Sequence, residues 1–238
     1  MRSCIGLFYI AILAWPAAGQ TPDALYADRA SPESAARAAE LWAADLAETG
    51  SFEAAWKLAR VSYWLGGHAP EGERRSSLER GIAASRRAIA LQPGRPEGHF
   101  WLGANMGALA ESFGILNGLK YRKSIKDALQ TVLRLDPAFM NGSADRAIGR
   151  WYFKVPRLFG GSNARAEAHL RAALQYDEDS TISHFFLAEV LLDERRAEEA
   201  RAELQRVIDA PINPDWVPED QDYKARAGRL LESLASGR

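Results

Sequence analysis

The chain has 238 residues, of which 47% are hydrophobic, and its 30 Lys+Arg against 31 Asp+Glu give a net charge of −1. This balance argues against a nucleic-acid-binding protein, which normally carries a basic excess, and the hydrophobic content excludes a disordered chain. Alanine, leucine, arginine and glutamate dominate, which is the composition of closely packed helices. The length permits one large domain.

Residues 1–19 have the features of a cleavable secretory signal peptide. Arg2 supplies the positive charge, residues 5–15 are apolar, and residues 17–19 are small, as required just before a cleavage site. The apolar run is shorter than the roughly 20 residues that span a bilayer. The alternatives are an uncleaved anchor and a buried N-terminal helix.

The expected mature chain is therefore residues 20–238, one helical repeat domain. The single cysteine, Cys4, lies inside the predicted signal and not at the position of a lipoprotein cysteine. We expect a periplasmic or secreted protein with no disulfide, no cysteine metal ligand and no stable membrane anchor after cleavage.

From residue 34 onward, apolar residues recur at helical spacing, and no segment alternates over the length of a strand. Turn-forming residues interrupt the pattern, among them Gly66-Gly67 and Asp136-Pro137. The pattern predicts ten helices, at residues 34–48, 52–65, 71–91, 96–112, 120–135, 141–153, 163–176, 180–193, 197–209 and 218–235.

The predicted helices come in related pairs. In the segment 180–211, apolar and small residues follow the spacing of a tetratricopeptide repeat of about 34 residues. Small residues allow the two helices of a pair to approach closely, and larger ones fill the grooves between pairs. The positions that match this pattern here and in two earlier pairs include Leu102, Gly103, Gly149, Ala166, Ala173, Leu187, Ala188, Ala200 and Leu204.

The two middle pairs are irregular, because each holds extra residues at the turn between its two helices. Helices 34–48 and 52–65 fit an N-terminal pair loosely, and helix 71–91 has the pattern of a second helix without a normal first. The sequence therefore predicts an all-α, tetratricopeptide-like solenoid of antiparallel helix pairs, with irregular middle repeats and a capping helix at 218–235.

The segments 81–93, 99–103, 132–137, 149–153 and 155–162, in this order and spacing, resemble the TatT family. This is the tetratricopeptide T-component associated with some TRAP-type solute transporters. The chain is also similar to the regulator of microtubule dynamics family. The TatT resemblance implies a periplasmic helical scaffold that engages a solute-binding protein, with a pore or groove for an apolar ligand. The chain departs from TatT proteins in lacking a lipid-accepting cysteine, and a microtubule role does not fit an exported chain.

No motif of catalysis accompanies the repeats. The glycines at 98, 103 and 107 fit neither the Walker phosphate-loop spacing nor the dinucleotide-binding fingerprint. The Gly-x-Ser-x-Gly motif of a nucleophilic serine is also missing from the sequence. The histidines lack zinc-site spacing, and we expect His99 and His184 to pack within helix pairs. A hydrolase that uses helical carboxylates such as Glu111 and Glu189 is an alternative function, ranked behind the two binding functions given below. We expect no enzyme activity, no cofactor and no metal site.

Aromatic residues gather at the two insertions in the middle pairs. Both insertions, the first at residues 113–121 and the second around residues 155–161, fall at the turn between the helices of successive pairs, so stacking of the pairs brings them to one side of the solenoid. We predict that they line a groove for a ligand or partner; the alternative is that they only fill the core. The candidate binding residues are Phe113, Leu116, Tyr121, Trp151, Phe153 and Phe159.

A short basic cluster, Lys120, Arg122, Lys123 and Lys126, follows the first insertion. It fits an acidic partner, an anionic membrane surface or a solvated helix face. Taken together, these features predict a non-enzymatic exported scaffold that binds a protein, for which the resemblance implies a solute-binding protein of a TRAP-type transporter. The alternative is a stand-alone carrier of an apolar small ligand in the aromatic groove.

Overall fold

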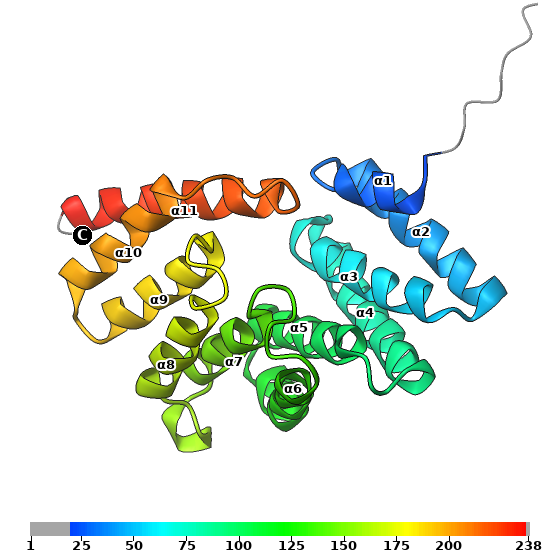
Figure 1. Cartoon of the computed structure of the whole chain (residues 1–238), viewed down its shortest axis with the longest axis horizontal. Helices are drawn as coiled ribbons and strands as arrows, with labels where there is room; N and C mark the ends of the chain where they lie inside the picture. Colours follow the sequence, from blue (N-terminus) through cyan, green and yellow to red (C-terminus); the bar gives the residue numbers. More distant parts are fainter. Residues whose placement is uncertain (1–19, 237–238) are drawn as a thin grey trace, which may run out of the picture.

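The computed structural model describes residues 20–236, which form only helices and their connections; the side chains of residues 115–117 are not described. Eleven α-helices follow one another around an arc in this part of the chain (Figure 1). They are α1 (Pro22–Ala27), α2 (Pro32–Thr49), α3 (Phe52–His68), α4 (Glu71–Leu91), α5 (Pro96–Ser112), α6 (Ile115–Leu135), α7 (Ser143–Lys154), α8 (Asn163–Ala173), α9 (Thr181–Asp193), α10 (Ala197–Asp209) and α11 (Val217–Ala235), with a 3-10 turn η1 at Arg157–Phe159 between α7 and α8.

The predicted all-α fold is confirmed. The bounds of α4, α5 and α10 agree with the prediction, and most other helices differ by a few residues at their ends. The expected signal peptide, residues 1–19, lies outside the described residues. Within residues 20–236, no helix is both long enough and apolar enough to cross a membrane.

Three helices differ most from the prediction. Helix α1 has only six residues, too few for a periodic pattern, and it begins because Thr21 Oγ1 accepts a hydrogen bond from Ala24 N (3.2 Å) with Pro22 in the first turn. Helix α3 continues through Gly66-Gly67, because Gly66 lets Leu78 of α4 pack against its backbone; a Cβ there would lie 2.2 Å from Leu78 Cδ2. Helix α6 begins at Ile115, so the first insertion is helical.

The helices pack as consecutive antiparallel pairs. Extensive contacts join α3 with α4, α5 with α6, α7 with α8 and α9 with α10; α4 also packs extensively on α5, and α2 packs on both α1 and α3. The predicted contact of helix 34–48 with helix 52–65 is present, because α2 packs on α3, and α3 packs still more extensively on α4. The short α1, which precedes and packs on α2, is the one α-helix of the described chain that the sequence pattern did not predict.

The predicted close-packing positions lie where the helices of a pair meet. A Cβ on Gly149 of α7 would lie 2.7 Å from Leu170 Cγ and 3.1 Å from the Ala166 carbonyl oxygen of α8. Gly103 makes the corresponding contact with Leu129 in the preceding pair. Leu102 is partly buried. The residues at the remaining positions are fully buried: Ala166, Ala173, Leu187, Ala188, Ala200 and Leu204.

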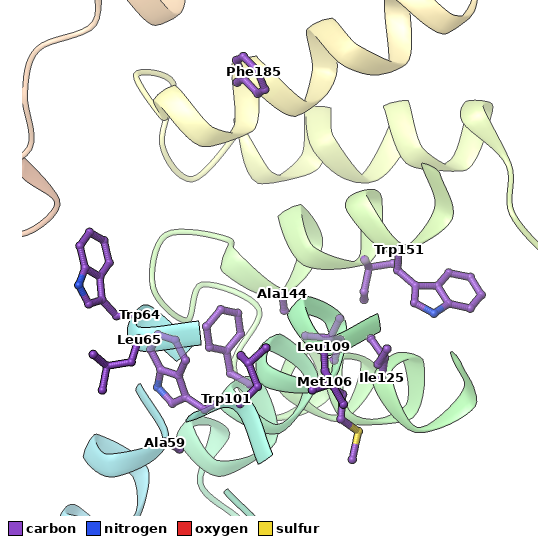
Figure 2. Close-up of a cluster of buried hydrophobic side chains, with 14 of the residues drawn as sticks. Ala59, Trp64, Leu65, Trp101, Met106, Leu109, Ile125, Ala144, Trp151 and Phe185 are labelled. Atoms are coloured by element: carbon purple, nitrogen blue, oxygen red, sulfur yellow. The ribbon is translucent and has the colours of Figure 1, made fainter. Parts of the chain in front are cut away.

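One hydrophobic core runs through the array from α1 to α11. Figure 2 shows part of it, where Trp101 of α5 lies beside Trp64 and Leu65 of α3, and Leu109 faces Ile125 of α6. Each pair thus buries its apolar faces against both neighbours, as in other repeat proteins.

Candidate functional site

The first helices of successive pairs form the inner face of the arc. Helix α3 contacts α5, α5 contacts α7, α7 contacts α9, and α9 contacts α11. The second helices lie outside them (Figure 1). A continuous inner surface built in this way is the usual binding surface of a repeat array.

Arg29, in the turn between α1 and α2, joins the two ends of the arc. Its guanidinium forms a two-pronged ion pair with Glu219 of α11, with Nε donating to Oε1 at 2.9 Å. It also donates from Nη2 to the backbone oxygen of Asp215 (2.9 Å), and the Arg29 carbonyl accepts from Trp64 Nε1 (2.8 Å). The helical array therefore closes on itself, and α1 and α11 approach each other in Figure 1.

The environment of Arg29 favours its charged form. The side chain is only 3% exposed, and its guanidinium lies over the rings of Tyr26 (4.8 Å) and Trp216 (5.9 Å). Burial lowers the pKa of Arg29, but the hydrogen bonds and charge of Glu219 outweigh burial and raise that pKa. Arg29 is thus a buried and fully paired cation, and its contacts hold the two ends of the array together.

Two cavities lie beside this closure. The larger, of about 920 Å³, is bounded by α1, α3, the turn 136–142 and the segment 214–218. The smaller, of about 380 Å³, is bounded by the start of α9 and the connection before α11. Both fall within the size range of small-molecule sites. They share the wall residues Met140, Asn141, Pro214 and Trp216, so the two are adjoining compartments.

The shared wall is built by an unusual turn between α6 and α7. Met140 and Asn141 have φ angles of +46° and +55°, and they are followed by Gly142 at +74°. Asn adopts this left-handed region readily, but for Met it costs of order 1–3 kcal/mol. The turn is held by backbone hydrogen bonds from Asn141 N to the Ala138 oxygen (3.0 Å) and from Ser143 N to the Phe139 oxygen (3.1 Å). It brings Phe139 and Met140 to the cavity wall.

Arginines on the inner face differ sharply in how they are paired. Arg150 of α7 forms ion pairs with Glu111 of α5 and Glu189 of α9, bridging three first helices. Burial lowers the pKa of Arg150, but these two carboxylates outweigh it and raise that pKa. For Arg60 of α3 and Arg146 of α7, burial dominates and lowers the pKa of each guanidinium. Both of these arginines line the cavities.

The residues predicted for the first insertion lie at the α5–α6 turn. Phe113 is partly buried against the core, with Arg75 of α4 over its ring at 5.2 Å. Tyr121 is partly buried on the core, with Lys120 Nζ at 4.9 Å from its ring. Leu116 is in the first turn of α6, and its side chain lies outside the described residues.

The residues predicted for the second insertion lie close to α6. Trp151 is buried, and its Nε1 donates to the Arg122 carbonyl oxygen (3.0 Å). The Arg122 guanidinium lies over the ring of Phe159, 5.3 Å from its centroid, and Phe159 is 37% exposed. Phe153 is partly buried against the core. Arg122 thus links the beginning of α6 to the second insertion.

The five candidate residues whose side chains are described do not line either cavity. The structure brings Trp151 and Phe159 together around Arg122, whereas Phe113 faces Arg75 on α4. A groove shared by the two insertions stays a prediction. Of the basic cluster, Lys126 lies over Trp151 (4.9 Å) and Lys123 pairs with Asp127 on the helix surface.

Two histidines occupy the same position in their repeats and make the same contact. His184 Nε2 lies 2.7 Å from the backbone oxygen of Glu178, and His99 Nε2 lies 2.9 Å from that of Pro93, in each case six residues earlier. His184 also binds Glu203 of the partner helix through Nδ1 (2.6 Å). These are packing contacts within helix pairs. Among the described residues, no three His, Cys, Asp or Glu side chains gather as metal ligands.

The residues at the closure, Arg29, Arg60 and Glu219, are not among the site residues predicted from the sequence. One local signal could have pointed toward them: Thr21-Pro22-Asp23 has the cap, proline and acidic residue of a helix start. Recognising α1 would have placed Arg29 in an ordered turn. Its pairing with Glu219, 190 residues away, leaves no local sequence signal.

The comparisons with known proteins agree with this architecture. A crystal structure of a thermophilic TPR protein from Thermus thermophilus matches with a TM-score of 0.66 at 23% identity, covering 88% of this chain and 97% of that one. At this identity the likeness shows the fold alone. No curated protein matches the chain.

Two family models match overlapping parts of the chain. The model described as "Regulator of microtubule dynamics protein 1-3" covers residues 20–159, and "TRAP transporter T-component" covers residues 97–231. Each spans more than half of the 238 residues. The chain therefore belongs to the TRAP transporter T-component family and, through its N-terminal and middle repeats, to that of the regulators of microtubule dynamics.

Proposed function

We propose that this protein is an exported, non-enzymatic scaffold that docks a periplasmic solute-binding protein of a TRAP-type transporter. The tetratricopeptide-like fold and the T-component family indicate a protein-interaction scaffold associated with the periplasm. The proposal adds export of this chain and the identity of the partner. The match of residues 97–231 to the T-component model is the observation that carries it.

The docking surface that we propose is the edge of the array around the second insertion. Leu158 is 88% exposed and the adjacent Phe159 37% exposed, while most large apolar side chains of the described chain are buried. Contiguous exposed apolar side chains often mark protein contacts. Arg122 lies against Phe159, so cations border the apolar residues and favour an acidic rim on the partner.

A crosslinked pull-down from envelope extract tests this proposal, with tagged residues 20–238 as bait and mass spectrometry as the readout. We expect stoichiometric capture of a solute-binding protein by the wild type and at least tenfold less by Leu158→Asp/Phe159→Asp. Ile208→Asp on α10 is the matched control, because Ile208 is 36% exposed on another part of the surface. Capture that is absent, or that both variants reduce equally, would contradict the proposed role and surface.

Export is tested separately by the N-terminus of the protein purified from the envelope. We expect the mature chain to begin at Gln20, as residues 17–19 predict. The alternative function, a stand-alone carrier of an apolar ligand, predicts instead an empty pull-down and a small molecule retained in native mass spectrometry. The larger cavity supports this second candidate because aromatic side chains line it.

A further inference from the structure

Arg60 is a partly buried cation, 20% exposed at its side chain, that the rest of the described chain does not neutralise well. Its Nε is buried and has no hydrogen-bond partner among the described residues. The nearest carboxylate, Asp23, is 3.7 Å from Nη2 and is itself bound by Lys57 at 2.9 Å. Arg29, on the same cavity wall, has two carboxylate contacts and a backbone acceptor instead. Of the two neighbouring arginines, Arg29 is thus fully paired and Arg60 is under-paired.

Aromatic rings cover the face of the Arg60 guanidinium. Its Cζ lies 3.8 Å from the ring centroid of Tyr26, 4.9 Å from that of Trp56 and 5.6 Å from that of Trp42. Such stacking compensates part of the desolvation of the cation. It does not satisfy the Nε–H donor, because the N–H groups of a guanidinium point outward in its plane and not toward its faces. A planar acceptor such as a carboxylate fits that edge.

The cavity beside Arg60 supplies an apolar wall for the rest of a ligand. Trp56, Phe139, Met140 and Trp216 line it together with Arg60. A volume of about 920 Å³ accommodates a drug-sized molecule. A concave apolar surface with one converging charged group is the usual form of a small-molecule site.

The carboxylates of the wall limit the charge of the ligand. Asp23 is paired with Lys57, Glu97 with Arg95, and Asp28 accepts from the Ser34 hydroxyl at 2.6 Å. Asp215 lies near enough to Arg29 to raise the pKa of that guanidinium. These four negative groups repel a dianion, so a single carboxylate is the best match for the under-paired Arg60.

We propose that the larger cavity binds a monocarboxylate with an apolar body, its carboxylate against the in-plane edge of Arg60 and its body against Trp56, Phe139 and Trp216. This inference goes beyond the docking of a solute-binding protein and does not depend on it. A failed pull-down would contradict the docking proposal but not the ligand site. A failure to bind the ligand would contradict the ligand site but not the docking surface.

Isothermal titration calorimetry with residues 20–238 tests the site, using 4-phenylbutyrate and its uncharged match 4-phenylbutyramide. We expect the acid to bind at least tenfold more tightly than the amide, and its affinity to fall with added sodium chloride while that of the amide does not. Equal binding of acid and amide, or no binding of either at millimolar concentration, would overturn the proposal.

Three arginine variants locate the carboxylate. Arg60→Gln should weaken binding of 4-phenylbutyrate at least tenfold and leave binding of the amide unchanged. Arg37→Gln is the control, because Arg37 is an exposed arginine paired with Glu40. If Arg146→Gln abolishes binding and Arg60→Gln does not, the assignment to Arg60 is wrong.

Folding of the variants is checked by circular dichroism. Arg60→Gln removes a desolvated cation whose Nε has no hydrogen-bond partner among the described residues, so we expect its Tm without ligand to stay close to that of the wild type. Should it fail to fold, Arg60→Lys serves instead: a lysine keeps the charge but loses the planar edge, and we expect it to bind the acid at least threefold more weakly. Unchanged binding in Arg60→Lys would then overturn the proposed geometry.

Discussion

Arg29 and Glu219 form a largely buried ion pair that joins the turn between α1 and α2 to α11, across 190 residues of sequence. Glu219 is 15% exposed at its side chain and Arg29 is 3% exposed. A repeat array otherwise interacts only with its nearest neighbours, which leaves its two ends independent. In this protein the two ends are coupled, and the larger cavity depends on that coupling because both α1 and the segment 214–218 line it.

Replacing Glu219 with Ala should open the closure. Removing one partner of a buried pair leaves an uncompensated charge, which costs roughly 3 kcal/mol. Because the middle pairs do not depend on this contact, we expect faster hydrogen exchange confined to residues 22–30 and 213–220, and a larger radius of gyration in small-angle scattering. Glu198→Ala is the control, since Glu198 is 92% exposed and its ion pair with Arg201, at 3.6 Å, is long and lies at the surface. Uniformly faster exchange along the chain would refute a local closure.

Gly149→Ala tests the close approach of α7 and α8. The added methyl would meet Leu170 Cγ at 2.7 Å and the Ala166 carbonyl oxygen at 3.1 Å. Because a backbone atom cannot move aside as a side chain does, we expect a loss of about 1–3 kcal/mol in urea unfolding. Gly107→Ala on α5 has no atom within 4 Å of its new Cβ, so it should raise stability by about 0.5–1 kcal/mol. Equal effects of the two substitutions would contradict this packing.

The fold could be predicted from local signals because each repeat is a local unit. Helical periodicity located most of the helices, and small residues such as Gly103 and Ala200 marked where the helices of a pair meet. Helix α1 was not predicted because it is only six residues long, and the end of α3 was placed too early because Gly66, which allows Leu78 to pack closely, is also a typical helix-ending residue.

The closure and the cavities could not be predicted in the same way. They depend on the summed curvature of all the pairs, which decides whether Arg29 reaches Glu219. Arginines are common in this chain, and only their surroundings distinguish the paired Arg150 from the under-paired Arg60. Aromatic residues drew attention to the insertions, where Phe159 lies at the edge and not in a cavity.

The phenol of Tyr26 should resist ionisation. Burial raises the pKa of Tyr26 to about 12, although Arg60 and Arg29 oppose the rise. A group whose pKa is raised on folding contributes stability that is complete below the unfolded value of 10 and is lost as the pH rises toward 12. We therefore expect Tyr26→Phe to reduce the loss of stability between pH 10 and 12, measured by urea unfolding. A wild type and variant with the same pH dependence would show that Tyr26 ionises normally.

Glu203 gives a pH dependence of the opposite sign. Burial by itself raises the pKa of Glu203, but hydrogen bonds and charge from His184 and Arg206 outweigh burial and hold that pKa below its usual 4.5. A carboxyl whose pKa is depressed on folding contributes stability that is present above the unfolded value and is lost as the pH falls below about 4.5. We expect Glu203→Gln to be less stable than the wild type at pH 7 and to lose less stability on acidification from pH 5 to 3. Urea unfolding across that range measures both, with Glu198→Gln as an exposed control on the same helix. Parallel pH profiles for wild type and Glu203→Gln would show that the bond to His184 does not stabilise the ionised carboxylate.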